Sequence, residues 1–151
     1  KTFSCSQGSR QVHTARGARI HCGYCAGCLL RRSAVFAAGL REPLDHYFLV
    51  DLSAPTLEAG VCRDAGRKVG RNDYDIAAHA VMGMEALARV GEGTEDDLMI
   101  RRNLFDAFPT TELPSAEVHL RALLEAHRRE WRSFKDSLAL SSWVNTHAAA
   151  L

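Results

Sequence analysis

The sequence predicts a mainly α-helical protein that begins with a small cysteine-rich knuckle and continues as a helical, bundle-like extension. Four of the five cysteines lie within residues 5–28, and three long stretches after residue 71 repeat apolar side chains at helical spacing. The 151 residues, 46% hydrophobic and 25% charged, have the size and composition of an ordinary globular domain. The expected organisation is a cysteine-rich segment over residues 1–48 and a helical extension over residues 49–151.

The distribution of apolar residues disfavours the membrane and secreted classes. The longest uninterrupted apolar run is Ala34–Ala38, whereas a membrane helix needs about 20 residues. The first residues contain no apolar segment of the kind found in a secretory signal. An odd number of cysteines without such a signal argues against a disulfide framework, so we expect a cytoplasmic protein with no membrane contact. Because the chain opens with Lys rather than Met, we expect it to be a piece of a longer protein.

The first helix is expected over residues 26–38, which are rich in Ala and Leu, and Gly39 suits its C-terminal stop. The polar residues 6–21 show neither helical nor strand periodicity and are expected to form a loop. Residues 47–50, Tyr-Phe-Leu-Val, fit a short strand or the end of a turn. Residues 54–71 are interrupted by three glycines and remain ambiguous.

Residues typical of helix starts and helix stops indicate two further helices. Asn72 is a good N-cap for a helix that stops before Gly91, because two aspartates follow in its first turn. Residues 94–97, Thr-Glu-Asp-Asp, resemble a capping box with Asp in place of Glu. They are expected to open a helix that Pro109 ends.

The longest helix is expected over about residues 116–138, with Ser115 as its cap. Its apolar side chains alternate spacings of four and three residues and form one continuous stripe. His127 lies within this stripe, and we interpret it as a packed core histidine rather than a metal ligand. Trp131 and Phe134 in the same stripe are expected to be core or interface residues.

The cysteine motif is Cys5-x16-Cys22-x2-Cys25-x2-Cys28. Four thiolates bind Zn²⁺ tetrahedrally, and a Cys-x2-Cys step brings two sulfurs to one metal through a tight turn, which Gly23 and Gly27 favour. A site with four protein thiolates leaves no position for water, so it would be structural rather than hydrolytic. The sequence therefore predicts a structural zinc site with Cys5, Cys22, Cys25 and Cys28 as ligands.

Three alternatives compete with this zinc site. An iron–sulfur cluster also uses four cysteines, but the typical run carries its fourth Cys just downstream beside a Pro, which is not found here. His13 or His21 could replace one cysteine as a ligand. The four residues could also be unrelated buried thiols, although the spacing argues against this.

Three segments stand out together: Ser4–Cys5, residues 21–28 (His-Cys-Gly-Tyr-Cys-Ala-Gly-Cys) and residues 31–39 (Arg-Arg-Ser-Ala-Val-Phe-Ala-Ala-Gly). Together they resemble the C-terminal zinc segment of the 7-cyano-7-deazaguanine synthase family. A Pro and a Tyr usually follow in the family, and Pro43 and Tyr47 stand in that region. The resemblance covers about residues 2–48, a third of the chain, and implies that the four cysteines are the zinc ligands.

The resemblance implies an ATP-dependent ligase on an α/β adenine-nucleotide alpha-hydrolase fold (PP-loop). Such enzymes convert 7-carboxy-7-deazaguanine, ATP and ammonia into the nitrile used for queuosine and related bases. The Ser-Gly-Gly-x-Asp-Ser phosphate loop of the family is absent from these 151 residues. ATP would therefore bind only in a missing N-terminal part, and no catalytic residue is assigned here.

Two departures from the family suggest a divergent branch. The Cys5–Cys22 loop is longer than usual, and about 100 residues follow the zinc segment where ordinary members end. An alternative function is therefore a synthase-like subunit of a bacterial anti-phage defence or nucleic-acid-modifying complex. A third hypothesis is a free-standing zinc interaction module without catalysis. The expected partners are further copies of the chain or the other subunits of such a complex.

The charge is unevenly distributed. Residues 1–48 carry seven basic and two acidic side chains, whereas the remainder is net acidic. A basic first third could contact nucleic acid, but arginine is abundant throughout the chain, which is the simpler explanation. Arg31 and Arg32, soon after Cys28, could bind a phosphate or carboxylate or lie on the solvent face.

Two other features of the sequence were weighed as functional. Asp75 and His79 would share a helix face, where they could bind metal or form a base–orienter pair, but a solvated face is favoured. Cys62 has no cysteine partner left and is expected to behave as a small hydrophobic residue.

Overall fold

The computed structural model describes residues 5, 12–13, 19–62 and 67–150 and shows a mainly helical molecule, as the sequence predicts. Within these residues, no helix combines the length and apolarity needed to span a membrane. The elements, in chain order, are β1 (Val12–His13), β2 (Arg19–Ile20), α1 (Ala26–Ala37), η1 (Leu44–His46), η2 (Glu58–Gly60), α2 (Arg71–Arg89), α3 (Thr94–Ala107), α4 (Leu113–Asp136) and α5 (Trp143–Ala148).

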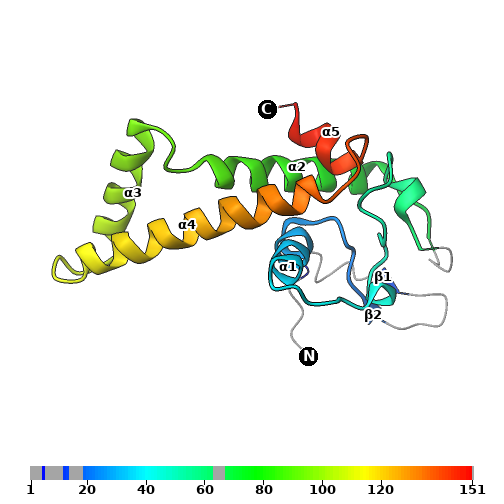
Figure 1. Cartoon of the computed structure of the whole chain (residues 1–151), viewed down its shortest axis with the longest axis horizontal. Helices are drawn as coiled ribbons and strands as arrows, with labels where there is room; N and C mark the ends of the chain where they lie inside the picture. The colour runs from blue at the N-terminus through cyan, green and yellow to red at the C-terminus, as the bar shows by residue number, and fades with distance from the viewer. Residues whose placement is uncertain (1–4, 6–11, 14–18, 63–66, 151) are drawn as a thin grey trace.

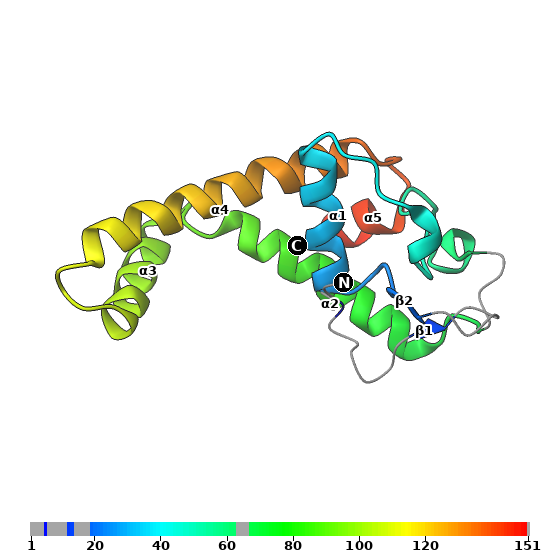
Figure 2. The ribbon, with the colours of Figure 1, turned by 90° about the horizontal axis from the view of Figure 1, so that it is seen from below.

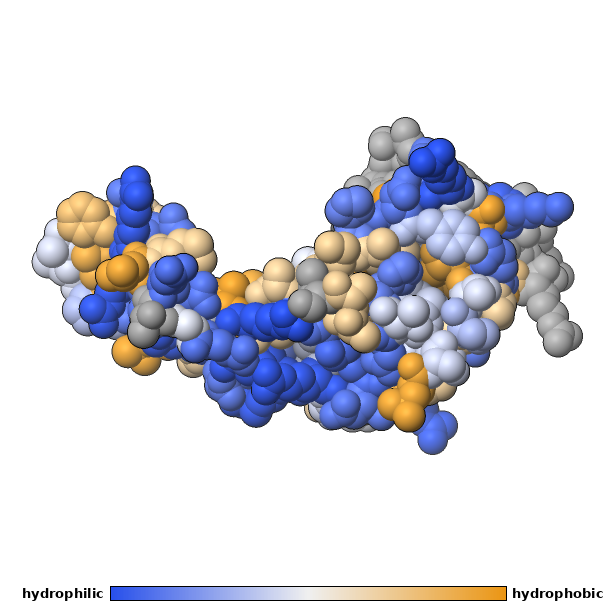
Figure 3. All heavy atoms as spheres, turned by 90° about the horizontal axis from the view of Figure 1, so that it is seen from above, coloured by the Kyte–Doolittle hydropathy of each residue, from blue (hydrophilic) through white to orange (hydrophobic). Residues whose placement is uncertain are grey.

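The two long helices α2 and α4 run antiparallel and in contact (Figure 1). At one end of this pair, α1 packs against both helices and α5 packs against α2 (Figures 1 and 2). At the other end, α3 connects them and packs against α4. Residues 94–124, here called the arm, form a lobe that a hollow separates from the rest of the molecule (Figure 3).

The start of α2 differs from the predicted cap. The helix begins at Arg71, and the carboxylate of Asp73 accepts a hydrogen bond from the N–H of Gly70 at 2.8 Å. Asn72 therefore lies inside the first turn and is not the cap. An aspartate at the third helical position satisfies a backbone donor that the helix leaves unpaired.

The starts of α3 and α4 also differ. Gly93 rather than Thr94 is the N-cap of α3, and Asp96 accepts a hydrogen bond from the Gly93 N–H at 3.4 Å. The capping box is thus present but begins one residue earlier than predicted. α4 begins before Ser115, with Glu112 at its N-cap, because Pro114 fits the first turn of a helix.

The strand pair β1–β2 and the helix α5 are absent from the prediction. Residues 6–21, expected to be a loop, contain the antiparallel pair β1–β2 with Val12 opposite Ile20. Two-residue strands are too short to show a sequence period. The sequence also predicts no helix where α5 lies, and the N-cap of α5, Ser142, accepts a hydrogen bond from the Asn145 N–H at 3.1 Å.

Residues 47–50 form isolated bridges rather than a strand. The Phe48 and Leu49 N–H groups donate to the carbonyls of His21 and Cys22 at 2.8 and 3.0 Å. Tyr47, Phe48 and Leu49 are fully buried. The segment therefore joins the cysteine-rich knuckle to the hydrophobic core.

The main core lies between α2 and α4 and continues into α1, α5 and the knuckle. Trp131 of α4 is fully buried, and its indole N–H donates to the Glu85 carboxylate of α2 at 2.9 Å. Lys135 forms an ion pair with the same carboxylate. His127 is buried with its Nε2 3.2 Å from the Met84 carbonyl, which confirms it as a packed histidine.

The arm has a small separate core. Ile100 and Leu104 of α3 pack with Leu124 of α4. Its outer surface carries six large hydrophobic side chains that are exposed: Leu98, Met99, Phe105, Phe108, Val118 and Leu123. The arm thus exposes large hydrophobic side chains besides those in its small core.

We expect Trp131→Ala to lower the free energy of unfolding by about 3–5 kcal/mol, because it opens a cavity between α2 and α4. Denaturant unfolding followed by circular dichroism measures this change. Leu140→Ala is the matched control, since Leu140 is 94% exposed and its removal should change the free energy by less than about 0.5 kcal/mol. If the two substitutions lowered the free energy of unfolding equally, Trp131 would not be part of the core between α2 and α4.

Candidate metal centre

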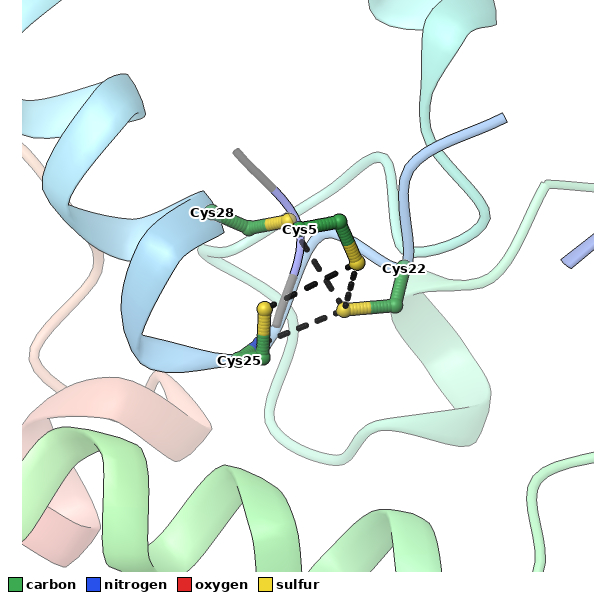
Figure 4. Close-up of side chains that lie close together, drawn as sticks. All are labelled: Cys5, Cys22, Cys25 and Cys28. Carbon is green, nitrogen blue, oxygen red and sulfur yellow. Dashed lines mark hydrogen bonds between the residues drawn. The ribbon is translucent and has the colours of Figure 1, made fainter. Parts of the chain in front are cut away.

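The structure brings Cys5, Cys22, Cys25 and Cys28 together, with all four sulfur atoms within 4.8 Å of one another (Figure 4). The Sγ–Sγ distance is 3.5 Å for Cys5–Cys22, 3.8 Å for Cys5–Cys25 and 3.7 Å for Cys22–Cys28. Four sulfurs around a zinc ion at about 2.3 Å would be separated by about 3.8 Å. All four are free thiols, and a disulfide would hold its sulfurs at about 2.05 Å. The cluster therefore has the size of a tetrahedral metal site.

A tight turn between the second and third cysteines shapes the cluster. Gly23 has φ +87°, and a Cβ there would lie 2.4 Å from the Leu49 carbonyl oxygen, so only glycine fits. The Cys25 N–H lies 3.4 Å from the Cys22 sulfur and donates to it. Gly27, which we expected to shape a second turn, lies inside α1 instead, so helix geometry alone presents Cys28.

Because the four thiols are close together and mostly buried, it is unfavourable for all of them to be ionised at once. Three are buried and Cys5 is half-buried. A hydrogen bond with Cys22 is the main cause that lowers the pKa of Cys5, to about 6. The hydrogen bond with Cys25 is the main cause that raises the pKa of Cys22. Without a cation, the thiolate form is therefore favoured at Cys5 and disfavoured at Cys22. A bound metal ion would instead deprotonate all of its thiol ligands.

A buried polar network, not predicted from the sequence, ties the knuckle to α2. The Tyr24 hydroxyl, between the second and third cysteines, donates to the Asp73 carboxylate. Arg67 donates to both oxygens of that carboxylate at 2.7 and 2.9 Å, and its guanidinium lies over the Phe48 ring. Burial alone would raise the pKa of Asp73, but these hydrogen bonds and that from Gly70 outweigh it and lower the pKa. Asp73 therefore stays charged and joins the two segments.

The two arginines after Cys28 have structural contacts. Arg32 donates to the Leu49 and Val50 carbonyls at 2.9 and 2.6 Å and lies over the Tyr47 ring. Arg31 lies 3.1 Å from Nε2 of His21. His21 thus faces an arginine rather than the sulfurs, and the side chain of His13 falls outside the described residues.

Asp75, His79 and Cys62, the other candidate residues of the sequence, do not belong to the four-cysteine group. Asp75 and His79 are exposed on α2, which agrees with the solvated helix face expected from the sequence. His79 Nδ1 contacts the backbone carbonyl of Asp75 at 2.6 Å, which is not a carboxylate–imidazole pair. Cys62 is a half-buried free thiol that does not belong to the cluster.

We expect Cys25→Ala to lose its metal, since three ligands leave the ion open to water and competing ligands. Elemental analysis of the purified protein should fall from about one ion per chain to near zero. Amide hydrogen exchange of residues 19–40 should accelerate in the same variant. Cys62→Ala is the control and should keep the full metal content; an unchanged metal content in Cys25→Ala would remove that residue from the site.

We expect Tyr24→Phe to lower the free energy of unfolding by about 1–3 kcal/mol, because it removes a hydrogen bond to a buried charged group. The same substitution at the exposed Tyr74 should cost less than about 0.5 kcal/mol. Urea unfolding of both variants at neutral pH measures the difference. If Tyr24→Phe were as stable as Tyr74→Phe, the network would not hold the knuckle to α2.

Comparison of the chain with protein families, with curated proteins and with solved structures found no match. The four sulfur atoms and the residues around them are therefore the ground for assigning a function.

Proposed function

We propose that the four cysteines bind one zinc ion and that this ion is structural. The support is the fit between three sulfur–sulfur separations, of 3.5, 3.7 and 3.8 Å, and a tetrahedron of zinc–sulfur bonds. Four thiolates are the ligand set of structural zinc sites, whereas catalytic sites keep one position for water. Bound there, the ion would neutralise part of the thiolate charge and fix the knuckle.

The proposed ion connects segments that are distant in the sequence. Cys5 reaches the cluster from 17 residues before Cys22, and Cys28 belongs to the first turn of α1. Tyr24 then extends the connection to Asp73 of α2. The zinc site would therefore stabilise the packing of the first segment against the helical extension.

For the longer protein we propose a 7-cyano-7-deazaguanine synthase-like ATP-dependent ligase, with this chain as its zinc-bearing C-terminal part. The support is the resemblance over residues 2–48 together with its three-dimensional setting. The cysteine turn leads directly into α1, which contains most of the Arg-Arg-Ser-Ala-Val-Phe-Ala-Ala-Gly stretch. ATP and the deazaguanine carboxylate would bind to the part that carries the phosphate loop.

A second candidate is a synthase-like subunit of an anti-phage defence or nucleic-acid-modifying complex. The arm favours it, because six large hydrophobic side chains within residues 94–124 are exposed. Exposed hydrophobic side chains that lie together are typical of contact with another protein chain. In this reading the zinc segment keeps its structural role and the arm binds a partner subunit or a further copy of the chain.

The gene sequence upstream of Lys1 provides the first test. We expect it to encode a Ser-Gly-Gly-x-Asp-Ser loop, and its absence would leave only a zinc-stabilised interaction module. The protein with that segment should release pyrophosphate or phosphate from ATP in the presence of 7-carboxy-7-deazaguanine and ammonia, and should form the nitrile. The loop without nitrile formation would favour the second candidate. ATP turnover by residues 1–151 alone that survives cysteine substitution would contradict both synthase-like proposals.

A further inference from the structure

A shallow cavity of about 360 Å³, open to solvent, lies beside the cysteine cluster, between the start of α1 and one face of α2. It is lined by Cys25, Ala26, Asp75, Ile76, His79 and Ala80. Cys25 is the N-cap of α1 and one of the four clustered cysteines. The cavity therefore adjoins the proposed zinc site but is formed in part by residues that the site does not use.

The polar side chains of this cavity can all accept hydrogen bonds. Asp75 is an exposed carboxylate, and among the described residues no arginine or lysine forms an ion pair with it. His79 is also exposed at this cavity, and its Nδ1 donates a hydrogen bond to the Asp75 carbonyl at 2.6 Å. A ligand rich in donors and positively charged would match these groups.

The remaining wall of the cavity is apolar. Ile76 and Ala80 contribute it from successive turns of α2, and Ala26 faces them from α1. Aliphatic stems of lysine and arginine bury themselves against such surfaces while their charged ends stay with polar groups. The cavity thus combines an apolar wall with an anionic, acceptor-rich edge.

We propose that this cavity binds an aliphatic chain that ends in a guanidinium or ammonium group. The stem lies against Ile76 and Ala80, and the cationic end lies between the Asp75 carboxylate and the Cys25 side of the cluster. This inference rests on the proposed zinc site, since Zn²⁺ with four thiolates keeps a net negative charge that attracts the cation. An arginine or lysine side chain of a partner protein and a free alkyl amine share this chemistry.

Titration of the zinc-loaded, ¹⁵N-labelled chain with a capped Gly-Arg-Gly peptide tests the proposal by NMR. Shifts are expected at the amides of Ala26 and residues 75–80, with a dissociation constant on the order of 1 mM. The same peptide with citrulline, which is neutral and nearly isosteric, should bind much more weakly. Shifts confined to other regions, or equal binding of the two peptides, would overturn the proposal.

Two variants and one further ligand complete the test. Asp75→Asn should weaken binding by about fivefold, while Asp106→Asn, which neutralises an exposed aspartate in the arm, should leave it unchanged. An unchanged affinity in Asp75→Asn would contradict the proposal. Agmatine, a free alkylguanidine, should shift the same amides; weaker binding than the arginine peptide points to a protein ligand, and equal binding to a small amine.

The zinc content of each sample separates this inference from the proposed function. A sample with about one zinc per chain and no peptide binding would overturn the cavity proposal and leave the zinc site standing. A sample without metal under reducing conditions, with ligand binding unaffected by added zinc, would overturn the zinc site and the electrostatic argument that depends on it.

Discussion

Four cysteine sulfurs lie within 4.8 Å of one another, and the structure of the cysteine-rich knuckle depends on this constraint. Buried thiols at this separation compete for protons, and their pKa values move in opposite directions. A divalent cation removes the conflict because it binds all four groups as thiolates. In the account proposed here, that ion holds the turn at Gly23, the start of α1 and Cys5 in one arrangement.

Polar contacts, in addition to packing, join this cluster to the helices. Tyr24 lies between two of the cysteines and donates to Asp73, which also closes the start of α2. Arg32 of α1 donates to the carbonyls of Leu49 and Val50, which ties that segment to the helix. The arm has its own small core, so its stability should depend little on the metal.

Much of this arrangement could be predicted from local patterns. The cysteine spacing singled out the four residues that come together, and helical periodicity placed α1 to α4 to within a few residues. The caps were misplaced because Asp73 and Asp96 act from inside the first turn. The helix α5 was missed because six residues are too few to show a period. The Tyr24–Asp73 bond joins residues 49 positions apart, which no local pattern encodes.

X-ray absorption at the zinc edge of the purified chain tests the central claim most directly. The account predicts one shell of four sulfur atoms at about 2.3 Å from zinc, and no lighter ligand. A shell containing nitrogen or oxygen at about 2.0–2.1 Å would contradict the four-thiolate site. Iron in place of zinc would point instead to an iron–sulfur cluster and to redox chemistry.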